Sequence, residues 1–216
     1  MTWDNAFAAK ILPLLLQGLL TTVEITLIGF AIAAVLGLIW AILRRLGIPV
    51  LSQVVTFCVL FVRGTPLLVQ AYCAYFILPN FGLTFGAFET GVAVIGINYS
   101  AYLAEVYRAG IEAVPKGQWE AATALNLSQV HTWRRIVLPQ AIRVVLPMMG
   151  NYLIAMFKDS AVLSAITVVD LMATAQSIGS SNFRYLEPLT IAGLLFLLVS
   201  YPASVLISRL EARHAD

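Results

Sequence analysis

The sequence predicts an all-α membrane protein built around five membrane-spanning helices. Of its 216 residues, 60% are hydrophobic and only 11% are charged, whereas soluble domains carry about 25% charged residues. The apolar residues also gather in five long segments, each near the ~20 residues that cross a bilayer as a helix. The net charge of only +2 provides no basic surface for a nucleic acid. Together these observations exclude an ordinary soluble domain, a disordered chain and a nucleic-acid-binding module.

The apolar segments define the predicted spans as residues 14–43, 51–78, 90–107, 138–157 and 189–207. Helices are expected there because a helix satisfies its own backbone hydrogen bonds in hydrocarbon. Pro66 in the second segment and Pro147 in the fourth predict kinks, which neighbouring helices of a bundle can accommodate. No linker or clear repeat divides the chain, so one membrane domain over residues 1–216 is predicted. The N-terminus lacks the charged start of a signal peptide, so we expect the first span to be retained.

Lysine and arginine are unevenly distributed between the two ends of the spans, which predicts the orientation of the chain. If the N-terminus lies outside, nine cations lie on the cytoplasmic side and three on the outer side. The cytoplasmic set is Arg44, Arg45, Arg108, Lys116, Arg134, Arg135, Arg143, Arg209 and Arg213, and the outer set is Lys10, Lys158 and Arg184. The chain is therefore predicted to start outside and to end in the cytoplasm.

The longest polar connection, residues 108–138, lies on the predicted cytoplasmic side and has the pattern of two helices joined by a sharp turn. Asn126 suits a left-handed position at the end of the first helix, and Ser128 suits the N-cap of the second. Trp119 and Ala122 share one face of the first helix. We interpret this face as a contact surface for a partner, and the alternative is an amphipathic helix that rests on lipid headgroups.

The same loop resembles the EAA loop of ABC importer permeases. That pattern is Glu-Ala-Ala, three residues, Gly, nine residues and Ile-x-Leu-Pro, and the chain has Glu120-Ala-Ala, Asn126 in place of Gly, and Ile136-Val-Leu-Pro139 at the same spacing. Asn can adopt the left-handed geometry at modest cost, so the turn is expected to form. The ATPase-coupling residues that the resemblance implies are Trp119, Glu120, Ala121, Ala122, Leu125, Asn126, Ile136, Leu138 and Pro139.

Other stretches extend the resemblance over nearly the whole chain. Residues 63–70 and 99–122 are similar to permeases of the polar amino acid subfamily of the histidine/glutamine type. Residues 150–159 and 183–188, together with Asn126, are similar to the narrower branch of ectoine/hydroxyectoine permeases. The resemblance therefore implies a five-helix, MetI-like permease for a polar amino acid or compatible solute, with ectoine or hydroxyectoine as the best guess.

The resemblance also implies an assembly in the inner membrane. Its other members are a second permease subunit, identical or related, two ATP-binding subunits that bind ATP and magnesium, and an extracytoplasmic solute-binding protein. The helix around Glu120 would dock on the ATPase and transmit its closure to the spans. The chain has no Gly-x-x-x-x-Gly-Lys-Ser/Thr phosphate loop, so we expect it to bind no cofactor and to have no enzymatic activity of its own.

Charged side chains within the spans need a partner, because a charge that faces lipid is costly. Arg63 lies about halfway along the second span and Glu105 near the inner end of the third. We expect the two to form an ion pair that holds these spans together, and a direct role toward the substrate is the alternative.

Polar residues near the predicted outer half of the bundle are candidates for the substrate path. They are Asn98 and Ser100 in the third span, and Lys158, Asp159 and Ser160 at the end of the fourth. A zwitterion needs one cationic and one anionic partner, and Lys158 and Asp159 offer both. The alternative is that the last three residues cap their helix or brace a gate.

Two other function classes compete with an importer permease. An intramembrane enzyme would need a nucleophile–base pair or a metal site. The sequence has no HExxH or GxSxG pattern, and its two histidines are isolated from its two cysteines, so no metal site is expected. An ion-coupled secondary transporter usually has more spans and inverted repeats in one chain.

Overall fold

The computed structural model describes residues 2–212, with side chains described through residue 209, and every regular element in this range is helical. The predicted all-α class is thereby confirmed for the described residues, while residue 1 and residues 213–216, with Arg213, lie outside them. In chain order the elements are α1 (Asn5–Arg45), α2 (Pro49–Gly64), α3 (Leu67–Tyr72), η1 (Cys73–Ile77), η2 (Leu78–Phe81), α4 (Ala87–Glu112), α5 (Lys116–Ala124), α6 (Gln129–Thr132), η3 (Trp133–Val137), α7 (Leu138–Asp159), η4 (Ser160–Ile166), α8 (Leu171–Asn182) and α9 (Leu186–Ala212).

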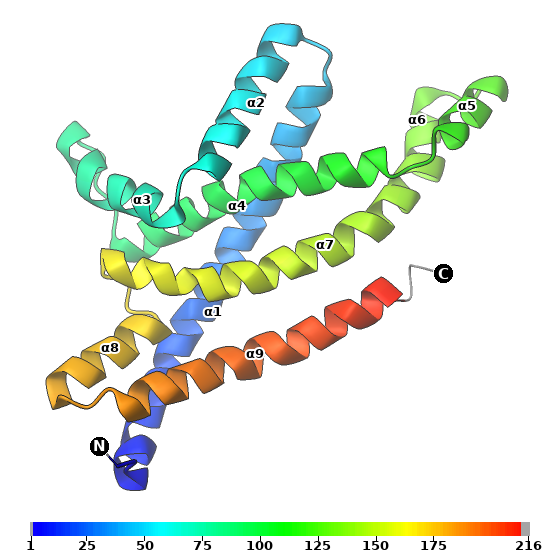
Figure 1. The fold of residues 1–216 in the computed structure, drawn as a ribbon. Coiled ribbons are helices and arrows are strands. Elements are labelled where there is room, and N and C mark those ends of the chain that lie inside the picture. Colours follow the sequence, from blue (N-terminus) through cyan, green and yellow to red (C-terminus); the bar gives the residue numbers. More distant parts are fainter. Residues whose placement is uncertain (1, 213–216) are drawn as a thin grey trace.

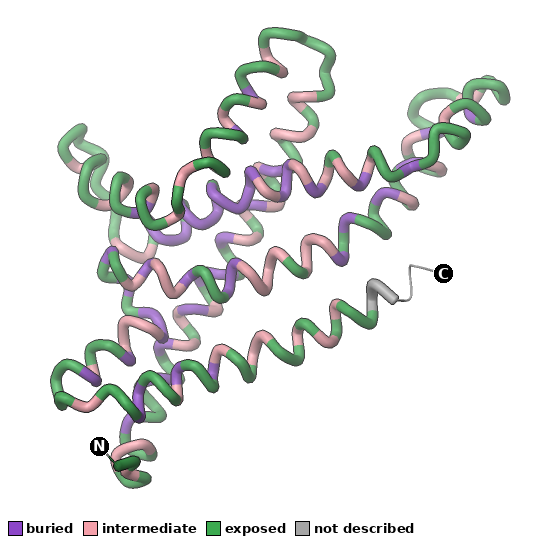
Figure 2. The backbone as a smooth tube through the Cα atoms, viewed as in Figure 1, coloured by how far each residue is buried: buried purple, intermediate pink, exposed green. Residues whose placement is uncertain are grey.

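The long helix α1 organises the bundle. Helices α4, α7 and α9 follow one another side by side, and α1 crosses all three and also packs against α2 and α8 (Figure 1). Helices α5 and α6 lie at one end of the molecule, and the N-terminus and α8 lie at the opposite end (Figure 1). Burial is concentrated along α4 and on the part of α1 that crosses it, as Figure 2 shows.

Three helical stretches are long and apolar enough to cross a membrane: Asn5–Arg45, Gln129–Ile166 and Leu186–Arg209. A fourth span results if α2 and the bent stretch Leu67–Phe81 count together. Helix α4, with 26 residues, does not belong to this set, although it lies at the centre of the fold. Length and hydropathy of the observed helices therefore support three or four spans, where the sequence predicts five.

The second predicted span is broken rather than kinked. Helix α2 ends at Gly64, Thr65 and Pro66 are extended, and the chain continues at an angle of 101°. Proline disfavours the helical conformation of the residue before it and donates no amide hydrogen, which explains the break. The side-chain amide of Gln70 donates to the carbonyl of Val62 at 2.8 Å and so satisfies one acceptor that the break frees. By contrast, α7 runs through Pro147 unbroken.

Helix α1 approaches its neighbours closely because small residues recur along one side of it. Gly18, Thr22, Gly29, Ala33 and Gly37 are all buried, and most are four residues apart. Such small-residue patterns allow close packing of membrane helices, where hydrocarbon provides no hydrophobic drive for association. A Cβ atom at position 37 would lie only 2.9 Å from the Cβ of Leu103 in α4. The crossing of α1 and α4 therefore brings the two backbones nearly into contact.

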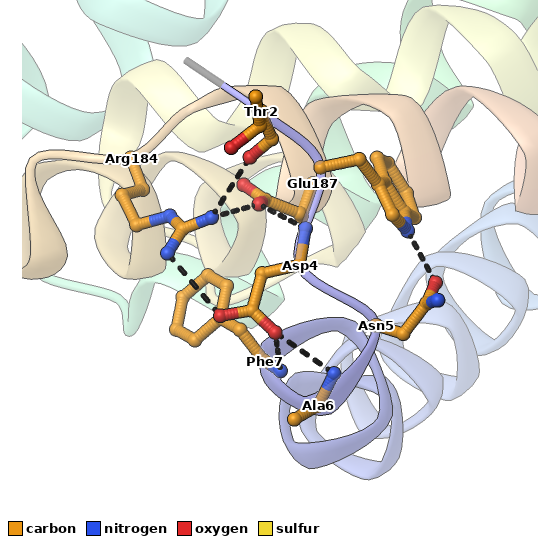
Figure 3. Close-up of polar contacts among 8 residues, drawn as sticks. Thr2, Asp4, Asn5, Ala6, Phe7, Arg184 and Glu187 are labelled. Atoms are coloured by element: carbon orange, nitrogen blue, oxygen red, sulfur yellow. Dashed lines mark hydrogen bonds and ion pairs between the residues drawn. The ribbon is translucent and has the colours of Figure 1, made fainter.

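A cluster of charged groups ties the start of α1 to the start of α9 (Figure 3). The Asp4 carboxylate caps α1 by accepting the amides of Ala6 and Phe7, and it also pairs with Arg184 at 3.4 Å. The Phe7 amide and Arg184 together hold the pKa of Asp4 below its usual range. Glu187, only 1% exposed, accepts from the guanidinium of Arg184 and from the backbone amide of Asp4. With Asp4 as its N-cap, α1 begins at Asn5, which is nine residues before the predicted start of the first span.

Candidate functional site

A polar cavity of about 550 Å³ opens beside the break between α2 and α3. Its volume falls within the ~300–1,000 Å³ that is typical of small-molecule sites. The charged, amide and aromatic side chains that line it come from α2, α4 and α7, and they are Arg63, Asn98, Tyr99, Tyr102, Tyr152 and Asp159. Arg63 lies in the last turn of α2, which ends at Gly64 beside this cavity.

Three tyrosines form one wall of the cavity and orient its carboxylate. The ring centres of Tyr99, Tyr102 and Tyr152 are 5.7–6.4 Å apart, within the range of favourable aromatic pairs. The hydroxyl of Tyr99 donates to the carboxylate of Asp159 at 2.7 Å. This bond joins α4 to α7 and holds the carboxylate of Asp159 at the cavity wall.

The ion pair predicted between Arg63 and Glu105 is present only at the limit of an ionic contact, at 4.0 Å. Glu105 instead lies 2.6 Å from Arg44 and 2.8 Å from Arg108, so its carboxylate ties α4 to α1. The guanidinium of Arg63 lies over the ring of Tyr102, 5.2 Å from its centre. Glu105 therefore compensates the charge of Arg63 only weakly. The side chain of Arg63 lines the cavity.

The structure brings together two of the five predicted substrate-path residues. Asn98 and Asp159 both line the cavity, and the amide of Asn98 also donates to Gln70 at 3.1 Å. Lys158 is exposed and does not line the cavity. The cation that accompanies Asp159 is thus Arg63 rather than the predicted Lys158, because successive residues of a helix point in different directions.

The two predicted serines have structural roles. The hydroxyl of Ser100 donates to the carbonyl of Ile97 and accepts from the indole of Trp40, which joins α4 to α1. Ser160 is buried and donates to the carbonyl of Phe157 at the end of α7. The three tyrosines were not predicted as site residues, although Tyr99 and Tyr102 are three residues apart and so share one face of their helix next to Asn98.

The loop between α4 and α7 forms the helix–turn–helix that the sequence predicts. Asn126 has a left-handed backbone with φ of +52°, and the amide of Leu127 donates to the carbonyl of Ala122 at 3.0 Å across the turn. Ser128 caps α6 by accepting the amide of His131. The α5–α6 pair therefore has a defined shape set by its own backbone hydrogen bonds.

The face of α5 that we interpreted as a partner surface packs inward instead. Trp119 is half-buried, and its ring meets that of Trp133 edge to face at 5.5 Å. Ala122 is buried, and Trp119 packs against the cluster of Val114, Val137 and Ala141. The apolar residues of this face serve to fasten α5 to the bundle.

The exposed side of the loop carries the acidic residue of the motif. Glu120, Ala121 and Asn126 are exposed, Leu125 is 71% exposed, and nearby Val130 is 67% exposed. Of the remaining motif residues, Ile136 is half-buried, and Leu138 and Pro139 are exposed at the start of α7. This loop therefore exposes a carboxylate and two aliphatic side chains.

The sequence and the fold of this chain both match known proteins. Residues 33–215 match the family model described as the inner membrane component of binding-protein-dependent transport systems. The chain belongs to this family. One relative of this permease is a probable amino-acid ABC transporter permease protein, y4tG, of Sinorhizobium fredii (strain NBRC 101917 / NGR234). It is 44% identical over 211 residues, which cover 95% of the permease and 91% of the relative.

Two solved structures share the fold of the permease over nearly its whole length. A chain from the crystal structure of an amino acid ABC transporter with histidines superimposes with a TM-score of 0.94 at 38% identity, covering 99% of this chain and 100% of that one. A chain of the MetNI methionine ABC transporter, in an inward-facing conformation, gives a TM-score of 0.70 at 17% identity and covers 98% and 99%. The second comparison shows the fold alone, which is that of MetI-like permeases.

The family makes the permease a transmembrane transport component of the inner membrane, in agreement with its apolar helices. Neither an ion-coupled secondary transporter nor an intramembrane enzyme fits this family. The relatives described above are amino-acid and methionine transporters, and they give no support to a special closeness to ectoine permeases.

Proposed function

We propose that the permease is the membrane subunit of an ATP-driven importer of polar amino acids, and that its solute binds in the cavity between α2, α4 and α7. The observation that carries this proposal is the pairing of Arg63 and Asp159 on the walls of one cavity. An amino acid zwitterion carries one charge of each sign. Its carboxylate would bind the guanidinium of Arg63, and its ammonium would bind the carboxylate of Asp159.

We propose that the energy for transport arrives through the α5–α6 loop. In this assembly two ATP-binding subunits contact the exposed side of the loop around Glu120, and a second permease copy or a close relative completes the path. An extracytoplasmic binding protein delivers the solute at the opposite end. The exposed carboxylate of Glu120 and the exposed Leu125 and Val130 support this arrangement.

We further propose that α4 is a fifth span. Its 26 residues would extend about 39 Å, which exceeds the ~30 Å hydrocarbon core. Its polar residues lower its hydropathy, but Thr90, Asn98 and Ser100 are buried and do not face lipid. Its exposed charged residues, Glu89, Arg108 and Glu112, lie toward the two ends of the helix, near the two membrane surfaces. Five spans place the two termini on opposite sides, and the arginine-rich end with α5 lies in the cytoplasm.

The proposed substrate class is tested by uptake into proteoliposomes that contain the permease, its ATPase subunits and its cognate binding protein. Glutamine, arginine, cystine and ectoine are compared as labelled solutes, because ectoine is also a small zwitterion and remains a candidate substrate. Saturable uptake of ectoine alone would favour the compatible-solute branch. Uptake of none of these solutes with ATP present would contradict the proposal.

Two variants separate solute binding from energy coupling. Asp159→Asn should lower solute affinity by about 10- to 100-fold, which corresponds to losing a charged hydrogen bond worth ~1.5–3 kcal/mol. Lys158→Gln is the matched control and should leave affinity unchanged, since Lys158 does not line the cavity. Glu120→Lys should abolish ATP-driven uptake while leaving membrane insertion intact. Normal uptake by Glu120→Lys would contradict coupling through the loop.

A further inference from the structure

A second cavity, which we call the inner-end groove, differs in chemistry from the solute cavity. It measures about 560 Å³ and lies between the end of α1, the end of α4 and the start of α7, near the end of the bundle that carries α5 and α6. Its walls are almost wholly apolar, and most of their side chains are aliphatic, with Leu38, Ile42, Leu138 and Ile142 among them. No acidic side chain of the described residues lines the groove, so it offers no partner to the ammonium of an amino acid.

Among the described residues that line the inner-end groove, Arg45 is the only cation. The guanidinium carbon of Arg45 lies 4.9 Å from the centre of the Trp133 ring and 5.7 Å from that of Trp119. Within residues 2–209, Arg45 has no carboxylate at ionic distance, whereas the adjacent Arg44 is paired with Glu105 at 2.6 Å. The two indole rings position a charge for which the side chains described, residues 2–209, supply no counter-ion.

The geometry points to an anionic phospholipid as the occupant of the inner-end groove. One acyl chain would lie along the aliphatic walls, and the phosphate would bind Arg45. Three observations support this occupant: the exposed aliphatic side chains of the walls, the tryptophan that lines the groove, and the arginine without a carboxylate partner among the described residues. Leu38, Ile42 and Ile142 are exposed in the groove, so a lipid chain can enter from the side. Tryptophan is enriched at the level of lipid headgroups, and basic pockets between membrane helices bind acidic headgroups.

A lipid in the groove would also affect the α5–α6 loop. This consequence rests on the proposed function. Arg45 contacts Trp119, which directly precedes Glu120 in α5. A lipid phosphate that holds Arg45 would hold the tryptophan pair with it, and so would steady α5 against α1. The lipid is thus placed to regulate how firmly the coupling loop is attached to the bundle.

Lipid binding can be measured without any transport assay, so its failure is distinguishable from failure of the proposed function. The full chain is reconstituted with equal amounts of phosphatidylglycerol and phosphatidylcholine, extracted in mild detergent, and analysed by native mass spectrometry for retained lipid. We expect phosphatidylglycerol to be retained over phosphatidylcholine. Arg45→Gln should reduce this preference about fivefold, the effect of one cation near an anionic headgroup. Arg209→Gln, a cation of the same end that does not line the groove, should leave it unchanged.

A second pair of variants tests the aliphatic part of the groove. Ile142→Trp fills it and should reduce retention of both lipids, whereas Val144→Trp, on the same helix but outside the groove, should not. Equal retention of the two lipids by the unaltered chain, or an unchanged preference in Arg45→Gln, would overturn the proposal. If Ile142→Trp dissociates a dimer and leaves lipid retention unchanged, a second copy occupies the groove and the proposal is also overturned.

Discussion

Replacing Gly37 by alanine should force α1 away from α4 and destabilise the bundle. The new Cβ would lie 2.9 Å from the Cβ of Leu103 and 2.9 Å from the carbonyl oxygen of Ser100, whereas ordinary contacts begin at 3.4 Å. Neither of these atoms can move unless the backbone of α4 moves with it. The two helices must therefore separate by about 0.5 Å at their crossing, and overpacking of this kind costs about 1–3 kcal/mol.

The assay is thermal unfolding of the purified permease in detergent, followed by tryptophan fluorescence. A cost of this size should lower Tm by roughly 2–12 °C, at about 2–4 °C per kcal/mol for a chain of this length. Gly86→Ala should cost less, because its Cβ would meet only the carboxylate end of exposed Glu89, which can rotate away. Gly193→Ala, with no atom within 4 Å of its Cβ, is the matched control and should leave Tm unchanged or slightly raised.

The ranking of the three glycine variants is the decisive result. Equal Tm values for Gly37→Ala and Gly193→Ala would refute the close approach of α1 and α4. A larger loss for Gly86→Ala than for Gly37→Ala would refute the distinction between rigid backbone and flexible side-chain neighbours.

Three further predictions concern single positions. Asn126→Val should destabilise the left-handed turn between α5 and α6 by about 1–2 kcal/mol and speed proteolysis of the loop, whereas Asn126→Gly should not. Burial raises the pKa of Asp170 to about 6, and one of its carboxylate oxygens has no hydrogen-bond partner among the described residues. The stability that this group contributes is therefore full below its unfolded pKa near 3.8 and is lost as the pH rises through 6, by about 3 kcal/mol. Asp170→Asn should flatten the dependence of Tm on pH between 4 and 7, and an unchanged slope would contradict this assignment. Glu187→Ala should lower Tm, because it leaves the guanidinium of Arg184 without its buried partner, and the equivalent change at exposed Glu89 should have no such effect.

Local features of the permease could be predicted from its sequence because they depend on neighbouring residues. The turn at Asn126 and the cap at Ser128 follow from the conformational preferences of single side chains. The fourth and fifth predicted spans match α7 and α9 to within a few residues, because long apolar runs have one stable form in lipid.

Features that depend on how helices face one another could not be predicted in the same way. A helix that is apolar all round gives no sign of which side meets protein and which side meets lipid. In the short, polar helix α5 the lone Trp119 was interpreted as a partner-facing residue, but it packs against Trp133, which reaches it only through the fold. Lys158 was expected to accompany Asp159 because the two are adjacent in the sequence, whereas the cation that lines the cavity with Asp159 is Arg63, from a helix distant in the sequence.

The near-contact of α1 and α4 limits how this permease can change shape. Two helices whose backbones interlock at glycine cannot slide or rotate past each other without steric collision, so any transport cycle has to carry them as a single rigid body. The joint that absorbs the movement must then lie elsewhere, and the extended Thr65–Pro66 step, which separates α2 from α3 and borders the polar cavity, is positioned to serve as that hinge.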